Sequence, residues 1–329
     1  MSSKFAQRRT TLTFVAKAAV SALLVAIVLS RVDLAGVRQS LAAAYWPELA
    51  AALVIFTATP LLGGLRWWLA MRGIGKQAGL LELTGFFSVG LVVGQVLPSV
   101  AGDGLRVWFC SRRGYGLPVS VQSVLIERVF MVLSLLALAL ATSPLLGALT
   151  GDRGPVWLSG ALFAIGVGGF VFLLAADRAP VPFAHLRVWQ AFAYAAEPAR
   201  RLLRSRWGPM LALTGVVSNL NFALVAFVLG QALDVKATAW DFLAIMPAVT
   251  IATTLPISLG GWGVREGVFV LLLGRVGVPA AEALSLSLLF GLFGMVSGFP
   301  GLLAWAIGWR GRNDAAPTGN ALSFPPAGR

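Results

Sequence analysis

Cysteine and histidine are almost absent from this sequence of 329 residues, in which Cys110 and His185 are the sole examples. One cysteine excludes an internal disulfide and a cysteine-based zinc site, and one histidine excludes a histidine cluster. Walker, HExxH and GxSxG motifs are absent as well, so any transport must run downhill or on an ion gradient. We therefore expect neither a metal site nor a cofactor.

Charged residues are also scarce, at 12%, whereas 58% of the residues are hydrophobic and the mean hydropathy is +0.83. Such a chain must lie mostly in an apolar solvent, which predicts an all-α integral membrane protein. The net charge is +13 and the pI is about 11.4. Because the basic residues cluster between apolar runs, the charge indicates membrane topology and does not predict a nucleic-acid partner.

Apolar runs long enough to cross a bilayer predict about six spans. They cover residues 12–29, 47–71, 119–146, 156–176, 207–229 and 283–307. Basic residues in the segment 1–11 predict a cytoplasmic N-terminus, and the same rule places the C-terminus in the cytoplasm. The tail 311–329 is rich in alanine, proline and glycine, and we expect it to be disordered.

Two further apolar stretches are each broken by Leu-Pro and glycines before an arginine and a carboxylate appear. The residues of the two breaks are Pro98, Gly102 and Gly104, and Pro256, Gly260, Gly261 and Gly263. A full crossing at the first break would place the arginine-rich segment 177–206 outside, against the charge bias. We therefore predict re-entrant helical hairpins at residues 80–110 and 240–274, with a polar cavity between them.

The two breaks also resemble each other in sequence. Gly-Leu-Arg ending at Arg106 aligns with Gly-Val-Arg ending at Arg265, and a Gly-x-Pro sequence precedes the next span in both cases. This repetition predicts two inverted repeats, 12–150 and 151–310, a plan in which broken helices form a substrate site near the midplane.

Two basic segments have less specific interpretations. The segment 177–206 alternates apolar, aromatic and arginine residues, which predicts an amphipathic interfacial linker broken near Pro198; an anionic-lipid patch is the alternative. The arginine and tryptophan cluster from Arg66 to Arg72 is typical of an interfacial anchor, with a headgroup contact by Arg66 as the alternative.

The charged residues of the breaks and of the following span are the candidate site. Arginine binds phosphate through a planar fork of donors, so Arg106, Arg265 and Arg128 are candidates for holding an anionic lipid headgroup. The carboxylates could neutralise these arginines in the empty site, hold a cationic headgroup or accept a proton. The alternative is that all of these charges are structural pairs. The carboxylate candidates are Asp103, Glu127 and Glu266.

These residues occur in a pattern similar to that of a known family. Leu-Pro-x-x-x-Gly-Asp-x-x-Arg, Glu127-Arg128 and Gly-Gly-x-Gly-x-Arg-Glu resemble the flippase-like transmembrane domain of the lysylphosphatidylglycerol synthase family. The resemblance covers about residues 10–310. It implies lipid translocation or headgroup binding in the bacterial inner membrane, serving hopanoid, glycolipid or phospholipid pathways. The aminoacyl-transferring domain of two-domain members is not expected, because the chain ends soon after the last span.

Two other functions remain open at this point. A membrane enzyme acting on a lipid-linked substrate would use Asp103, Glu127 or Glu266 in acid–base work. A non-catalytic accessory protein would associate with lipid-biosynthesis enzymes. The sequence is compatible with a homo-oligomer.

The orientation can be tested by single-cysteine labelling. In a variant without Cys110, a cysteine placed within residues 177–206 should react with an impermeant maleimide only after the cytoplasmic face is opened. Labelling in intact cells or spheroplasts would show that this segment lies outside, and the predicted topology would be wrong.

Overall fold

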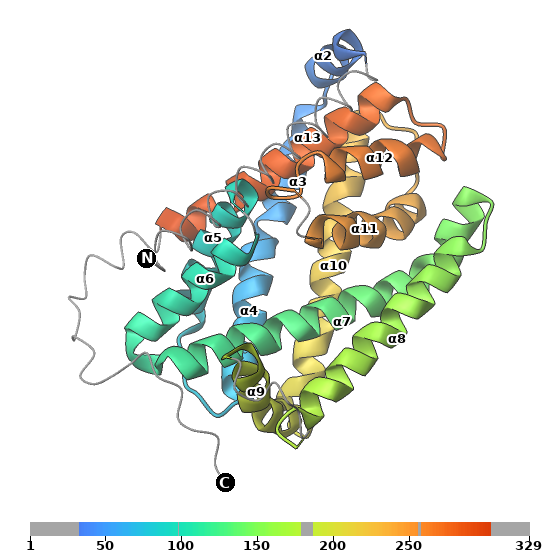
Figure 1. Cartoon of the computed structure of the whole chain (residues 1–329). Coiled ribbons are helices and arrows are strands. Elements are labelled where there is room, and N and C mark those ends of the chain that lie inside the picture. Colours follow the sequence, from blue (N-terminus) through green and yellow to red (C-terminus); the bar gives the residue numbers. More distant parts are fainter. Residues whose placement is uncertain (1–32, 98, 179–186, 256–257, 304–329) are drawn as a thin grey trace, which may run out of the picture.

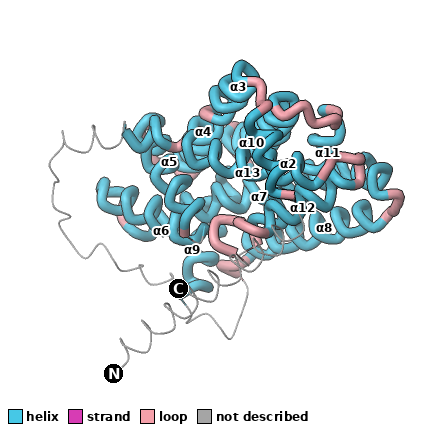
Figure 2. The backbone as a smooth tube through the Cα atoms, turned by 90° about the horizontal axis from the view of Figure 1, so that it is seen from above, coloured by secondary structure: helices cyan, strands magenta, loops and turns pink. Residues whose placement is uncertain are grey.

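The structure is a computed structural model, and it describes residues 33–97, 99–178, 187–255 and 258–303. All regular structure in these ranges is helical, and short loops join the helices (Figure 1, Figure 2). The elements are α2 (Leu34–Ala42), α3 (Trp46–Phe56), α4 (Ala58–Gly73), α5 (Leu80–Val96), α6 (Ser99–Cys110), the π-helical turn η1 (Ser111–Tyr115), α7 (Leu117–Thr150), α8 (Gly154–Ala175), α9 (Arg187–Leu203), α10 (Trp207–Ala232), α11 (Ala239–Thr254), α12 (Val264–Gly274) and α13 (Ala280–Ser297). The predicted all-α class is confirmed.

Five helical stretches are long and apolar enough to cross a membrane. They are α3 with α4 (Trp46–Gly73), α7, α8, α10, and α13 continued to Leu303. These stretches coincide with the second to sixth predicted spans. The first predicted span, 12–29, lies outside the described residues together with the tail 311–329 and His185, so the total of six stays a prediction.

The first predicted hairpin consists of α5 and α6, which pack along each other (Figure 1). The helices have 17 and 12 residues, or roughly 26 and 18 Å at 1.5 Å per residue, less than the roughly 30 Å hydrocarbon core. Helix α5 ends at Val96 and α6 begins at Ser99. Gly102 and Gly104 lie inside α6 and therefore do not form this break, contrary to the prediction.

The second predicted hairpin consists of α11 and α12, with 16 and 11 residues. Between them Gly260, Gly261 and Gly263 have φ angles of 56°, 80° and 84°, in the left-handed region that favours glycine. These three glycines lie in the loop between α11 and α12; Pro98 and Pro256 lie outside the described residues.

The two breaks touch each other. The indole Nε1–H of Trp262 donates a hydrogen bond to the backbone carbonyl of Gln95, near the end of α5, at 3.1 Å. Gly260 packs on the same carbonyl, because an added Cβ would lie 2.2 Å from that oxygen. The tips of the hairpins therefore meet inside the bundle.

Helix α9 is not broken near Pro198, contrary to the prediction, and runs through this residue. Proline lacks the N–H that would bond to the carbonyl of Tyr194, four residues earlier. The buried Gln122 of α7 replaces that donor, since its Nε2 donates to the Tyr194 carbonyl at 2.8 Å. The apolar face of α9 is buried against the bundle through Ala195 and Leu202.

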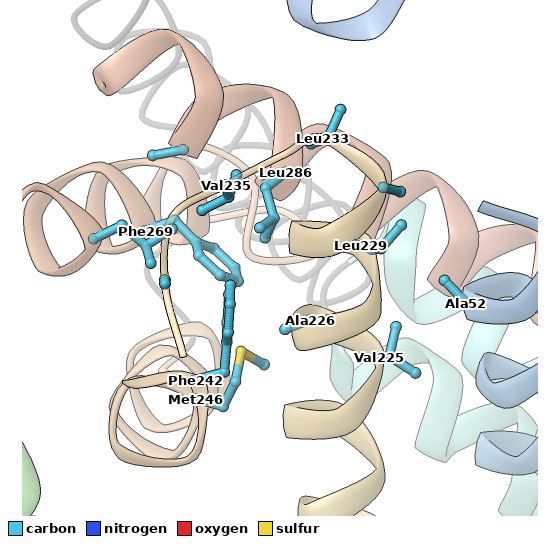
Figure 3. Close-up of a cluster of buried hydrophobic side chains, with 14 of the residues drawn as sticks. Ala52, Val225, Ala226, Leu229, Leu233, Val235, Phe242, Met246, Phe269 and Leu286 are labelled. Atoms are coloured by element: carbon cyan, nitrogen blue, oxygen red, sulfur yellow. The ribbon is translucent and has the colours of Figure 1, made fainter. Parts of the chain in front are cut away.

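A hydrophobic core joins α10 to the second hairpin and to α13 (Figure 3). Leu229 of α10, Phe242 of α11, Phe269 of α12 and Leu286 of α13 are all fully buried in it. Burial of these side chains fixes α11 and α12 to the neighbouring spans. The second hairpin is thus held by apolar packing against α10 and α13.

Two glycines of α6 provide a matched test of helix packing in the first hairpin. A Cβ on Gly102 would lie 2.2 Å from the carbonyl oxygen of Gly90, whereas one on Gly104 would meet nothing within 4 Å. We expect Gly102→Ala to destabilise the protein by about 1–3 kcal/mol through overpacking. Gly104→Ala should stabilise it by up to about 1 kcal/mol. Thermal unfolding in detergent measures both, and equal midpoints would contradict the close contact of α5 and α6.

Candidate functional site

A cavity of about 230 Å³ lies between the two hairpins. Its walls come from α3 to α7, α10 to α13 and the second break. The charged residues that line it are Arg66, Arg106, Arg128 and Arg265. No carboxylate is among the described residues that line it. The cavity therefore presents positive charge to any occupant.

Glu127 of α7 holds two of these arginines in place. Its carboxylate accepts a hydrogen bond from Arg66 Nε at 2.9 Å and one from Arg106 Nη2 at 2.9 Å. Arg66 also donates to the hydroxyl of Ser218 in α10. All three charged groups are at most 4% exposed. Opposite charges at these distances make the burial of each tolerable.

Asp103 connects Arg106 to Arg128, the third arginine of this cluster. It accepts from Arg106 Nη1 at 3.0 Å and from both Nε and Nη2 of Arg128, at 2.8 and 2.7 Å. Unlike Glu127, the side chain of Asp103 is 23% exposed, and that of Arg128 is 41% exposed. The cluster contains three arginines and two carboxylates, which leaves one positive charge in excess.

The second hairpin contributes a separate buried pair at the start of α12. Arg265 donates to Glu266 Oε1 from Nη2 at 2.8 Å, and Ser287 of α13 donates to the same oxygen at 3.2 Å. The other carboxylate oxygen accepts from the backbone N–H of Gly263, which caps the helix. A Cβ on Gly291 would lie 2.1 Å from Arg265 Nη2, so glycine there makes room for the guanidinium.

Aromatic rings cover both hairpin arginines. The guanidinium carbon of Arg106 lies 4.5 Å from the ring centre of Trp67 and 4.7 Å from that of Phe87. That of Arg265 lies 4.5 Å from Trp262. The rings stabilise the cations and exclude water from one face of each.

The structure thus brings Arg106, Arg128 and Arg265 to one cavity. Asp103, Glu127 and Glu266 stand behind the arginines and do not line the cavity. The charges are therefore paired structurally and, at the same time, all three predicted arginines line the cavity.

The site also contains residues that were not among the site residues predicted from the sequence. Arg66 was interpreted mainly as an interfacial anchor, but it is 4% exposed and lines the cavity. Its position more than one turn inside the predicted span 47–71 was the available signal. Ser218 and Ser258, which also line the cavity, gave no signal in the sequence.

The family model described as the lysylphosphatidylglycerol synthase TM region matches residues 14–301 of the chain. The chain belongs to this family. As a member of the lysylphosphatidylglycerol synthase TM family with five membrane-length helices, it is a multi-pass membrane protein with a role connected to membrane lipids. No curated protein is significantly similar to the chain.

The central position of Glu127 predicts a large loss of stability on its neutralisation. Glu127→Gln leaves the buried Arg66 and Arg106 without a full counter-charge, and we expect about 3 kcal/mol or more of destabilisation. Glu197→Gln is the control, since Glu197 forms an exposed pair with Arg201 at a spacing of four residues, worth less than about 0.5 kcal/mol. The midpoints of thermal unfolding in detergent measure both changes. Equal midpoints would show that the Glu127 cluster does not hold the bundle together.

Proposed function

We propose that this protein translocates or binds a membrane lipid with an anionic headgroup in the bacterial inner membrane, and that the arginine-lined cavity holds the headgroup. The observation that carries the proposal is the composition of the cavity wall, with four guanidinium groups and no carboxylate among its described residues. Guanidinium groups in a poorly hydrated site bind phosphate strongly and bidentately.

Hydrogen-bond donors that are not used within the protein support this assignment. The Nε of Arg106 and the hydroxyl of Ser258 are buried and have no hydrogen-bond partner among the described residues. Both residues line the cavity. Buried polar groups normally have a partner, and a phosphate oxygen would satisfy both. The volume, about 230 Å³, is below the roughly 300–1,000 Å³ of pockets for drug-sized ligands, which suits a headgroup without its acyl chains.

The arrangement of the hairpins supports translocation. Their tips meet through Trp262 and the Gln95 carbonyl. The open end of the α5–α6 hairpin lies beside the start of α7, whereas α13, which follows the other hairpin, packs against α2. These ends lie on different sides of the bundle (Figure 1). We infer that the hairpins are re-entrant from opposite membrane faces, within two inverted repeats, and that the headgroup site lies near the midplane.

Neither alternative function has comparable support. An acid–base enzyme needs a carboxylate that can reach its substrate, but Asp103, Glu127 and Glu266 are hydrogen-bonded to arginines behind the cavity wall. An accessory protein would not require a cavity with this charge. The accessory alternative predicts that charge-neutralising changes at Arg106 and Arg265 leave function intact, whereas the enzyme alternative predicts a product formed from lipid in detergent.

Reconstituted liposomes test the proposal. The purified protein should move NBD-labelled lipids with anionic headgroups between leaflets, as measured by dithionite reduction. The double variant Arg265→Gln/Glu266→Gln removes the guanidinium without leaving an unpaired buried carboxylate. We expect it to slow this movement about tenfold or more, the effect of losing one charge-assisted hydrogen bond.

Arg275→Gln is the matched control, because Arg275 is exposed at the other end of α12. It should translocate like the wild type. Thermal unfolding must first show that the wild type and the double variant are both folded. Equal translocation rates for the two proteins would then refute the role of the cavity arginines.

A further inference from the structure

A second depression lies apart from the hairpins, where the end of α8 meets α9. Its volume is about 460 Å³. The apolar side consists of Val171, Leu174, Ala175 and Leu203, and the polar side consists of Arg178, Arg200 and Arg204. We call it the α8–α9 groove. It joins a hydrophobic wall to a basic rim, at the point where a membrane-length helix ends.

Arg200 has a structural role in this groove. Its guanidinium donates to both oxygens of Asp177 and to the carbonyl of Leu174. That carbonyl belongs to the last turn of α8, where carbonyls lack helical partners. The hydrogen bonds from Arg200 lower the pKa of the Asp177 carboxyl, so the pair stays ionised at neutral pH. Arg200 thus connects α9 to the end of α8.

Arg178 and Arg204 have no such role. Both are exposed, and neither forms an ion pair with any described residue. They flank the ion pair of Arg200 on the rim of the groove. Two exposed cations that form no ion pair with a described residue leave the rim positive and able to take up an anion from outside.

The apolar wall indicates where that anion comes from. Only 6% of the most apolar stretch of α8 is buried inside the protein. Val171 and Leu203 are 57% and 41% exposed, although both line the groove. In a bilayer this wall faces lipid chains, while the end of the helix lies at headgroup depth. A soluble anion would match the rim alone, whereas a phospholipid matches both sides.

We propose that the α8–α9 groove is a binding site for an anionic glycerophospholipid of the surrounding bilayer, separate from the central cavity. Its phosphate contacts Arg178 and Arg204, and one acyl chain lies along Val171 and Leu174. The bound lipid would stay on the surface of the protein and would not be the translocated molecule. This site does not depend on the function proposed for the cavity.

Photo-crosslinking tests the site. The protein in nanodiscs receives phosphatidylglycerol with a diazirine in one acyl chain, or the same probe with a phosphatidylcholine headgroup. We expect the phosphatidylglycerol probe to label residues 171–175 and Leu203 preferentially. Arg178→Gln/Arg204→Gln should reduce this labelling roughly tenfold or more, since each basic residue contributes severalfold to anionic-lipid binding.

Arg201→Gln/Arg206→Gln is the matched control, because it removes two exposed arginines of the same region that do not line the groove. Val171→Trp fills the apolar side and keeps every charge, so it should also abolish labelling. The cavity variant Arg265→Gln/Glu266→Gln should leave labelling unchanged. Equal losses in both double arginine variants, equal labelling by both headgroups, or labelling that survives Val171→Trp would overturn the proposal.

Discussion

The rest of the site depends on the ion pairs that the carboxylate of Glu127 forms with two buried arginines. A guanidinium cannot remain charged inside an apolar bundle unless a counter-charge and hydrogen bonds accompany it. Glu127 accepts from Arg66 of α4 and from Arg106 of α6, while it is itself carried by α7. One carboxylate thus connects the first hairpin to two spans, and Ser218 extends the connection to α10. These helices carry the first three arginines of the cavity wall.

The charges differ in how firmly they are held. Glu127 and Glu266 are buried, whereas Asp103 is partly exposed and shares its oxygens between Arg106 and Arg128. The buried carboxylates fix the arginines from behind, and the aromatic rings of Trp67 and Trp262 cover one face of Arg106 and Arg265. What remains available to an occupant is the side of each guanidinium toward the cavity. The carboxylates therefore fix the positions of the arginines that line the cavity.

The sequence predicted the helical class and the position of five spans because long apolar runs have few alternatives in a bilayer. It also indicated Arg106 and Arg265, since each follows a Leu-Pro sequence and glycines that interrupt an apolar run. It did not reveal Arg66 as a partner of Glu127, because 61 residues separate them and contact depends on how helices pack.

The continuity of α9 through Pro198 was missed for the same reason, as the compensating amide of Gln122 lies in another helix. The sequence also did not distinguish glycines that form a break, such as Gly260, from Gly102, which permits close helix packing.

The contact between the hairpin tips has a consequence for how this protein can vary. Trp262 donates to the backbone oxygen of Gln95, and every residue type supplies that acceptor. The side chain at position 95 can therefore change without loss of the contact, although Gln95 is one of the residues that line the cavity. The donor has no such freedom, because only an indole or a side chain of similar reach can make this bond. Variation within the family should be tolerated at one end of this hydrogen bond and restricted at the other.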